Sequence, residues 1–245
     1  MTRTYTFSHE RQKARPDTFP FILILIFFLL TACTDDKNRS ADNLKNGVIK
    51  YQIHNLKFDI PLKYYYIAYV KYNKHWPAPK KERAEVKTFE IDALLPDMRP
   101  YSDADRVLFE ERGYGEKIYI WVSENHHRPL SEYLKSIGNS LTKTPPLKSA
   151  PSLIHFIDHL SAKKNLKGSG DLFFQSLNDE DLMLKIRCTR VNPERITFPY
   201  CSLYKEWKNG LLIKLTFSRK HLKNWAQIEQ NARALLDRFE VKTNQ

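Results

Sequence analysis

The sequence predicts an α+β domain in which an antiparallel sheet carries helices packed on one face. Three observations lead to this class. From Val48 onward, several short segments are rich in β-branched and aromatic residues, as is typical of strands. Asn209-Gly210 lies between two such segments and predicts a β-hairpin. The last segment, 219–240, has apolar residues at helical spacing, so we expect a C-terminal amphipathic helix over that hairpin.

The N-terminus has the pattern of an export signal. Four basic residues precede an uninterrupted apolar run, Phe21–Leu30. This run is too short for a membrane-spanning helix, which needs about 20 residues, so an export signal is favoured over a permanent anchor helix. Leu30-Thr31-Ala32-Cys33 follows and resembles the lipobox of bacterial lipoproteins. The resemblance implies that residues 1–32 are a signal peptide and that Cys33 is lipidated.

Residues 33–47 are polar and predict a flexible tether between the lipid and a globular domain. Such a tether has an r.m.s. span of roughly 20 Å, so the domain is expected close to the bilayer. Thr34 follows the lipidated cysteine, which by resemblance to bacterial lipoprotein sorting favours the outer membrane, facing the periplasm. Residues 48–245 form the globular α+β domain, either as one unit or as two lobes that meet near 144–150.

The chain is basic, with a formal net charge of +12. The leader holds four Lys/Arg and two Asp/Glu, which leaves +10 on the mature part. A basic balance raises the question of nucleic acid. Because the leader exports the chain, we expect no nucleic acid, and anionic lipid head groups or an acidic protein partner are the better candidates. Contact with the membrane is also expected through the lipid. A generally basic, soluble surface is the alternative.

Two cysteines remain once Cys33 carries lipid, namely Cys188 and Cys201. In an oxidising compartment an even pair favours a disulfide. The alternatives are two buried thiols or a metal pair without its other ligands. Because the two residues lie on predicted strands joined by a short turn, we expect them to come within bridging distance.

Other elements follow from periodicity and from turn residues. We expect a capped short helix from Ser102 to Gly113. Two longer helices are expected at Pro129–Lys143 and Ser149–Leu160, where apolar residues recur at helical spacing. In the hairpin a two-residue turn would place Tyr204 opposite Leu215, on the face under the C-terminal helix. Further strands are predicted at 48–54, 62–72, 86–94, 117–124, 172–177 and 182–191.

Few patterns in the sequence indicate catalysis. With seven glycines, the chain contains neither a phosphate-binding loop nor a nucleophile elbow. The segment from His155 through Asp158 to His159 resembles inverted zinc-peptidase motifs, but aspartate stands where they have glutamate. On a helix both histidines would lie opposite the apolar stripe and face solvent. We therefore expect no enzyme activity, no catalytic residue, no metal and no cofactor.

The segment Trp76-Pro77-Ala78-Pro79-Lys80-Lys81 is expected to be a surface loop, because two prolines cannot continue a strand ladder. Trp76, with Lys80 and Lys81, is the candidate partner-binding site. A tryptophan beside two prolines is held on a stiff loop and loses little entropy on binding. Alternatively, Trp76 folds back over the tyrosine-rich segment that precedes it.

The proline loop, the cysteine pair and the C-terminal helix together resemble small lipoproteins that act as immunity proteins against type VI secretion effectors. The resemblance covers the general layout of about residues 65–240. It implies a lipid-anchored binding protein that neutralises a secreted antibacterial effector. The alternatives are a structural or accessory envelope lipoprotein and, on the histidine motif, a zinc-dependent hydrolase.

Overall fold

The structure, a computed structural model, describes the residues 47–71, 77, 82–124, 141–148, 150–158, 170–178, 181–189 and 197–242. All of the described residues belong to one compact unit, Asp42–Gln245.

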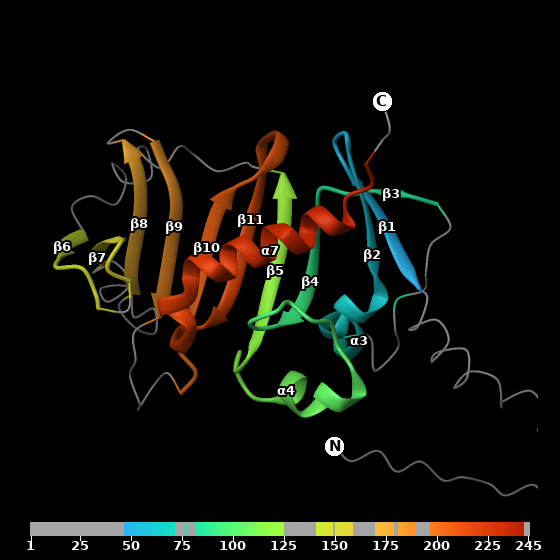
Figure 1. The fold of residues 1–245 in the computed structure, drawn as a ribbon, viewed down its shortest axis with the longest axis horizontal. Coiled ribbons are helices and arrows are strands. Elements are labelled where there is room, and N and C mark those ends of the chain that lie inside the picture. The colour runs from blue at the N-terminus through green and yellow to red at the C-terminus, as the bar shows by residue number, and fades with distance from the viewer. Residues whose placement is uncertain are drawn as a thin grey trace, which may run out of the picture. The chain divides into compact units, whose positions relative to one another are not determined.

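An eight-stranded antiparallel sheet is the framework of this unit (Figure 1). Its order is β4-β5-β11-β10-β9-β8-β7-β6. The strands are β4 (Thr88–Leu94), β5 (Lys117–Glu124), β6 (Leu141–Thr144), β7 (Ile154–Asp158), β8 (Gly170–Asn178), β9 (Asp181–Thr189), β10 (Tyr200–Glu206) and β11 (Leu211–Ser218). A second sheet, β2-β1-β3, joins β2 (Leu56–Pro61), β1 (Val48–Ile53) and β3 (Ala84–Glu85). The α+β class with an open antiparallel sheet is confirmed.

The C-terminal helix α7 (Trp225–Phe239) crosses one face of the eight-stranded sheet, after the 3-10 segment η5 (Arg219–Asn224) (Figure 1). Its predicted apolar stripe is buried throughout and belongs to the same core as the apolar side chains of β5 and β11. The prediction of an amphipathic helix over the hairpin is therefore confirmed. No helix in the described part of the chain is long and apolar enough to cross a membrane. The stripe comprises Leu222, Trp225, Ile228, Ala232, Leu235, Leu236 and Phe239.

The β10–β11 hairpin forms as predicted, but its register differs by one residue. Leu203, and not Tyr204, lies opposite Leu215. The loop has three residues, 208–210, and the N–H of Trp207 donates to the carbonyl of Leu211 at 2.7 Å. Within the loop, both Asn-Gly residues adopt positive φ, 52° and 72°. The expectation of a two-residue turn was therefore wrong by one position.

This shift exchanges the faces of β10, because successive side chains of a strand point to opposite sides. Leu203 now joins the core under α7, with no exposed surface. Lys205 lies on the same face, opposite Ile213. Its Nζ atom is 3.0 Å from the Glu229 carboxylate of α7, and that carboxylate also pairs with Arg233. The positive charge of Lys205 on the core face of β10 is thus paired with the negative charge of Glu229 on α7.

The segment 62–72 is not the predicted strand. It forms the 3-10 turn η1 (Leu62–Tyr64) and the helix α3 (Tyr66–Lys71). The first backbone N–H groups of a helix lack partners within it, and here the Asp92 carboxylate of β4 accepts from the Ile67 N–H at 2.7 Å. Tertiary partners of this kind override the strand propensity of a tyrosine-rich segment.

The two predicted central helices are also corrected. Within 149–160 the described residues contain the strand β7, which pairs with both β6 and β8. Residues 129–140 lie outside the described residues, whereas 141–144, at the end of the first predicted helix, form β6. A short apolar run is compatible with a buried helix and with a strand that is buried on both faces. Here pairing with the neighbouring strands selects the strand. The shorter predicted helix is present as η2 (Asp103–Asp105) and α4 (Arg106–Glu110), capped by the Ser102 hydroxyl.

The buried ion pair between β10 and α7 leads to a prediction about stability. Lys205→Ala removes a cation whose side chain is 18% exposed and leaves Glu229 with Arg233 alone. We expect a loss of about 1–3 kcal/mol in the free energy of unfolding, measured by urea denaturation. The matched control is Lys220→Ala, which removes a surface pair with Glu116 and is expected to cost less than about 1 kcal/mol. Equal losses in the two variants would contradict the assigned register.

Candidate functional site

Several predicted site residues lie outside the described residues. These are Cys33, Trp76, Lys80 and Lys81, together with His159 of the histidine motif. Lipidation and the partner-binding loop therefore stay predictions.

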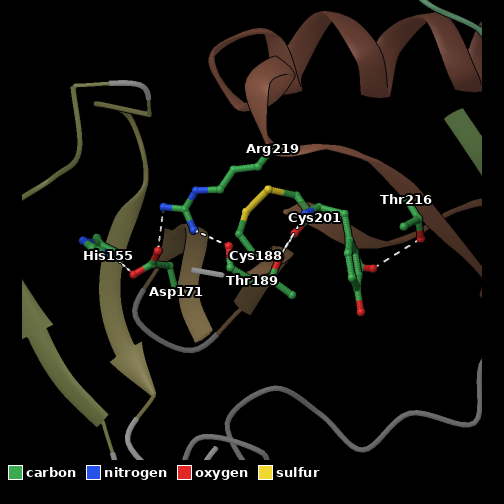
Figure 2. Close-up of a disulfide and its surroundings, with 9 residues drawn as sticks. His155, Asp171, Cys188, Thr189, Cys201, Thr216 and Arg219 are labelled. Atoms are coloured by element: carbon green, nitrogen blue, oxygen red, sulfur yellow. Dashed lines mark hydrogen bonds and ion pairs between the residues drawn. A yellow bond between two sulfur atoms is a disulfide. The ribbon is translucent and has the colours of Figure 1, made fainter. Parts of the chain in front are cut away.

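The predicted disulfide between Cys188 and Cys201 is present (Figure 2). The two residues lie directly opposite each other on β9 and β10, with their Cα atoms 4.0 Å apart. Both are fully buried on the face that α7 covers. In the chain-entropy model, a bridge that closes so short a loop contributes about 3 kcal/mol to stability. The bridge fixes the register of β9 against β10 near the centre of the sheet.

A row of buried polar side chains extends from the disulfide toward the sheet edge (Figure 2). Asp171 of β8 lies opposite Cys188 and is 4% exposed. Its Oδ1 atom is 3.1 Å from Nε2 of His155, and its Oδ2 atom is 2.6 Å from Arg219 of η5. Arg219 also donates to the carbonyl of Thr189 at 2.7 Å. The buried carboxylate is thus held by a guanidinium and an imidazole, as a buried charge requires.

His155 lies on a strand and is 4% exposed, so the expectation of a solvent-facing histidine was wrong. Its ring stacks on Phe173, with centroids 4.7 Å apart and an interplanar angle of 13°. Its Nδ1 atom is 2.5 Å from the hydroxyl of Thr144 on β6. In the described part of the chain, no group of three or more His, Cys, Asp or Glu side chains is placed to hold a metal ion.

Thr144, His155 and Asp171 stand in the order of a hydroxyl–imidazole–carboxylate triad. The carboxylate is shared with Arg219, however, and both ring nitrogens of His155 are used to connect neighbouring strands. The cluster thereby joins the outer strands β6, β7 and β8 to the segment that begins the C-terminal helix. Neither Asp171 nor Arg219 carried any signal in the sequence, because they are 48 positions apart and meet only through strand pairing.

A cavity of about 440 Å³ lies at the opposite end of the sheet, between α3, α4, β4 and β5. Its walls are mainly aromatic, from Tyr66, Phe109, Tyr114 and Tyr119. A volume of this size, with apolar walls and few polar groups, is typical of ligand pockets. No pattern in the sequence indicates this cavity, because its aromatic residues lie in α3, in α4, in the turn before β5 and in β5, and only the fold brings them together.

Two ionisable side chains of opposite charge line the cavity, Asp92 and Lys117. The Lys117 ammonium donates to the carbonyls of Phe109 at 2.8 Å and Glu111 at 2.6 Å. Burial lowers the pKa of Lys117, while the nearby carboxylates of Glu111 and Asp92 act in the opposite direction. The cavity therefore presents both signs of charge beside an apolar wall.

A stack of aromatic rings supports one wall of the cavity. Tyr66 stacks on Tyr101 with centroids 4.7 Å apart and contacts Phe109 at 5.0 Å. Burial, and then the hydrogen bond from the Tyr101 hydroxyl to Asp103 at 3.0 Å, raises the pKa of Tyr101 to about 12. The ring stays neutral up to strongly alkaline pH, which keeps this wall uncharged.

No protein-family model and no curated protein sequence matches the chain. Solved structures, in contrast, share its fold. One is Smlt3025, an immunity protein of the Stenotrophomonas maltophilia type IV secretion system, with a TM-score of 0.53 and 15% identity over 80% of this chain and 94% of that one. Another is the iron-regulated outer membrane lipoprotein FrpD of Neisseria meningitidis, with a TM-score of 0.51 and 15% identity over 79% and 92%. At this identity the likeness establishes a common fold.

The first site prediction concerns the buried carboxylate. Asp171→Asn removes the charge that faces Arg219, a side chain that is 18% exposed, and we expect a loss of about 3 kcal/mol in the free energy of unfolding. Asp97→Asn, at a carboxylate that is 62% exposed and 3.6 Å from Arg99, is the control and is expected to stay within about 0.5 kcal/mol. An Asp171→Asn protein as stable as the wild type would show that the cluster does not hold the strands together.

The second site prediction concerns alkaline titration. Asp103→Asn removes the acceptor charge beside the Tyr101 hydroxyl, so the pKa of Tyr101 is expected to fall from about 12 toward the ordinary value near 10. Because the folded-state pKa is raised, the contribution of Tyr101 to stability is complete below about pH 10 and is lost as pH rises toward 12. Tyrosinate absorbance, with Tyr101→Phe to assign the signal, measures the shift. An unchanged titration in Asp103→Asn would contradict the assigned cause.

Proposed function

We propose that this chain is a lipid-anchored envelope protein that binds and neutralises a secreted antibacterial effector. The observation that carries the proposal is the fold shared, over 80% of the chain, with an immunity protein of a type IV secretion system. The sequence resembles immunity proteins of type VI systems, whereas the fold neighbour belongs to a type IV system. The proposal is therefore that an effector is neutralised, whichever of these two systems delivers it.

The leader and the cysteines support an envelope location. The lipobox resemblance at Leu30–Cys33 implies export and lipidation, and the disulfide between Cys188 and Cys201 suits an oxidising compartment. The second fold neighbour is itself an outer membrane lipoprotein. In this proposal Cys33 carries the lipid and the domain faces the periplasm. The multiple acyl chains of a mature lipoprotein would make the anchor stable, whereas one chain alone binds membranes only marginally.

The net charge supports a protein partner of opposite sign. After removal of the leader the chain carries +10. A charge of this size speeds the encounter with an acidic partner and affects the association rate more than the final affinity.

An accessory role in the envelope is the second candidate function, and the likeness to FrpD favours it. The two candidates differ in one respect: an immunity protein is needed only when the effector is present, whereas an accessory protein is needed in its absence.

The deciding experiment deletes the gene and exposes the deletion strain to cells of the parent strain, which in this proposal deliver the effector. We expect the deletion strain to lose viability in contact with those cells, to grow normally alone, and to be rescued by the full chain. Survival equal to that of the parent strain, or a growth defect without attackers, would overturn the immunity function and favour the accessory role.

A second variant tests the anchor in the same cells. Cys33→Ser is expected to leave the protein out of the membrane fraction, and mass spectrometry of the wild-type N-terminal peptide is expected to show acylated Cys33. An unmodified Cys33 in wild-type protein purified from membranes would contradict lipidation without affecting the proposed neutralisation.

A further inference from the structure

Exposed apolar side chains gather around the cavity between α3, α4, β4 and β5. Val70 lines it and is 52% exposed. Tyr200, 39% exposed, packs on the cavity residue Tyr114 with ring centroids 5.5 Å apart. Phe198, 49% exposed, lies over Gly113, which also lines the cavity. We call the cavity with Val70, Phe198 and Tyr200 the cavity patch.

The position of Phe198 depends on the glycine beneath it. Gly113 has a φ of +72°, a conformation that other residues rarely adopt. A Cβ atom at this position would lie 2.7 Å from Cβ of Phe198. The backbone turn at Gly113 therefore allows a large aromatic ring from another segment to sit at the cavity while half of its surface stays in water.

The sheet face under α7 is not a candidate docking surface over the central strands, because the helix covers it. Ile118 and Ile120 of β5 face α7 and are fully buried. Since side chains alternate along a strand, Tyr119 and the opposite residue Asp92 of β4 point to the other face, and both line the cavity together with Lys117 and Ile118 of β5. Exposed apolar groups around a concave apolar pocket mark binding surfaces in soluble proteins.

The chemistry of the cavity selects its occupant. The two charged groups of the cavity already have partners within the chain: Asp92 accepts from the Ile67 N–H, and Lys117 donates to two backbone carbonyls. The four aromatic rings favour a neutral apolar group. A small molecule that filled the cavity would leave Phe198 and Tyr200 in water, whereas a protein surface would cover them together with the cavity.

We propose that the cavity patch is the docking surface for the effector, and that the cavity receives one large neutral side chain of the leucine, phenylalanine or tyrosine kind. The proposal rests on the proposed function, because it names the surface through which neutralisation occurs. It adds an anchor in a pocket, the arrangement in which a few residues supply most of the binding energy.

The test measures the affinity of the full lipoprotein, held in lipid nanodiscs, for the effector, identified as the parent-strain protein whose removal restores survival of the gene-deletion strain. Val70→Asp and Phe198→Asp each place a charge in the cavity patch and are expected to weaken binding by about 30-fold or more. Val70→Leu keeps the patch apolar and is expected to bind within about threefold of the wild type. All variants are expected to keep the wild-type melting temperature, because both positions are about half exposed.

The matched control is Val107→Asp. Val107 is a 79% exposed valine of α4 and, in the described part of the chain, is not among the residues that line the cavity. Its affinity is expected to equal that of the wild type. Full affinity in both Val70→Asp and Phe198→Asp, or an equal loss in Val107→Asp, would overturn the docking surface while the proposed function stands. Absence of binding by the wild-type protein would overturn both.

Discussion

Burial of one sheet face beneath α7 is the constraint on which the rest of this fold depends. An open antiparallel sheet is stable only if at least one face is removed from water. Here the helix stripe and the facing side chains of β5, β10 and β11 form a single core. Leu203, Leu235 and Leu236 have no exposed surface within it. Replacing one such leucine with alanine typically costs about 2–5 kcal/mol, which is a large part of a domain's stability.

The same constraint explains the charged and polar groups that lie on the covered face. Lys205, Asp171 and His155 each point toward the side that α7 or its preceding segment closes, and each has a partner there. An unpaired charge in such a position costs several kcal/mol, so these pairs make the packing specific at a modest net gain.

The proposed docking surface and the helix-covered core occupy different parts of this molecule. The core side chains under α7 are buried, whereas Val70, Phe198 and Tyr200 are exposed around the cavity at the β4–β5 end of the sheet. Substitutions at these three exposed residues are therefore expected to leave the core intact.

The sequence by itself determined the strand 117–124, the amphipathic helix and the pairing of Cys188 with Cys201, because periodicity and cysteine parity are local or countable signals. It also predicted a strand at 182–191, of which the structure describes β9 up to Thr189, and the hairpin at the Asn-Gly turn, though not its register. It did not determine the state of 62–72 or 154–158, where the composition fits more than one conformation and a capping carboxylate or neighbouring strands decide. The tertiary structure alone brought Asp171 to Arg219 and the four aromatic rings to one cavity. Such contacts depend on the order of the strands and on their register, and a register shift of one residue exchanges the two faces of a strand. No local sequence pattern determines either of them.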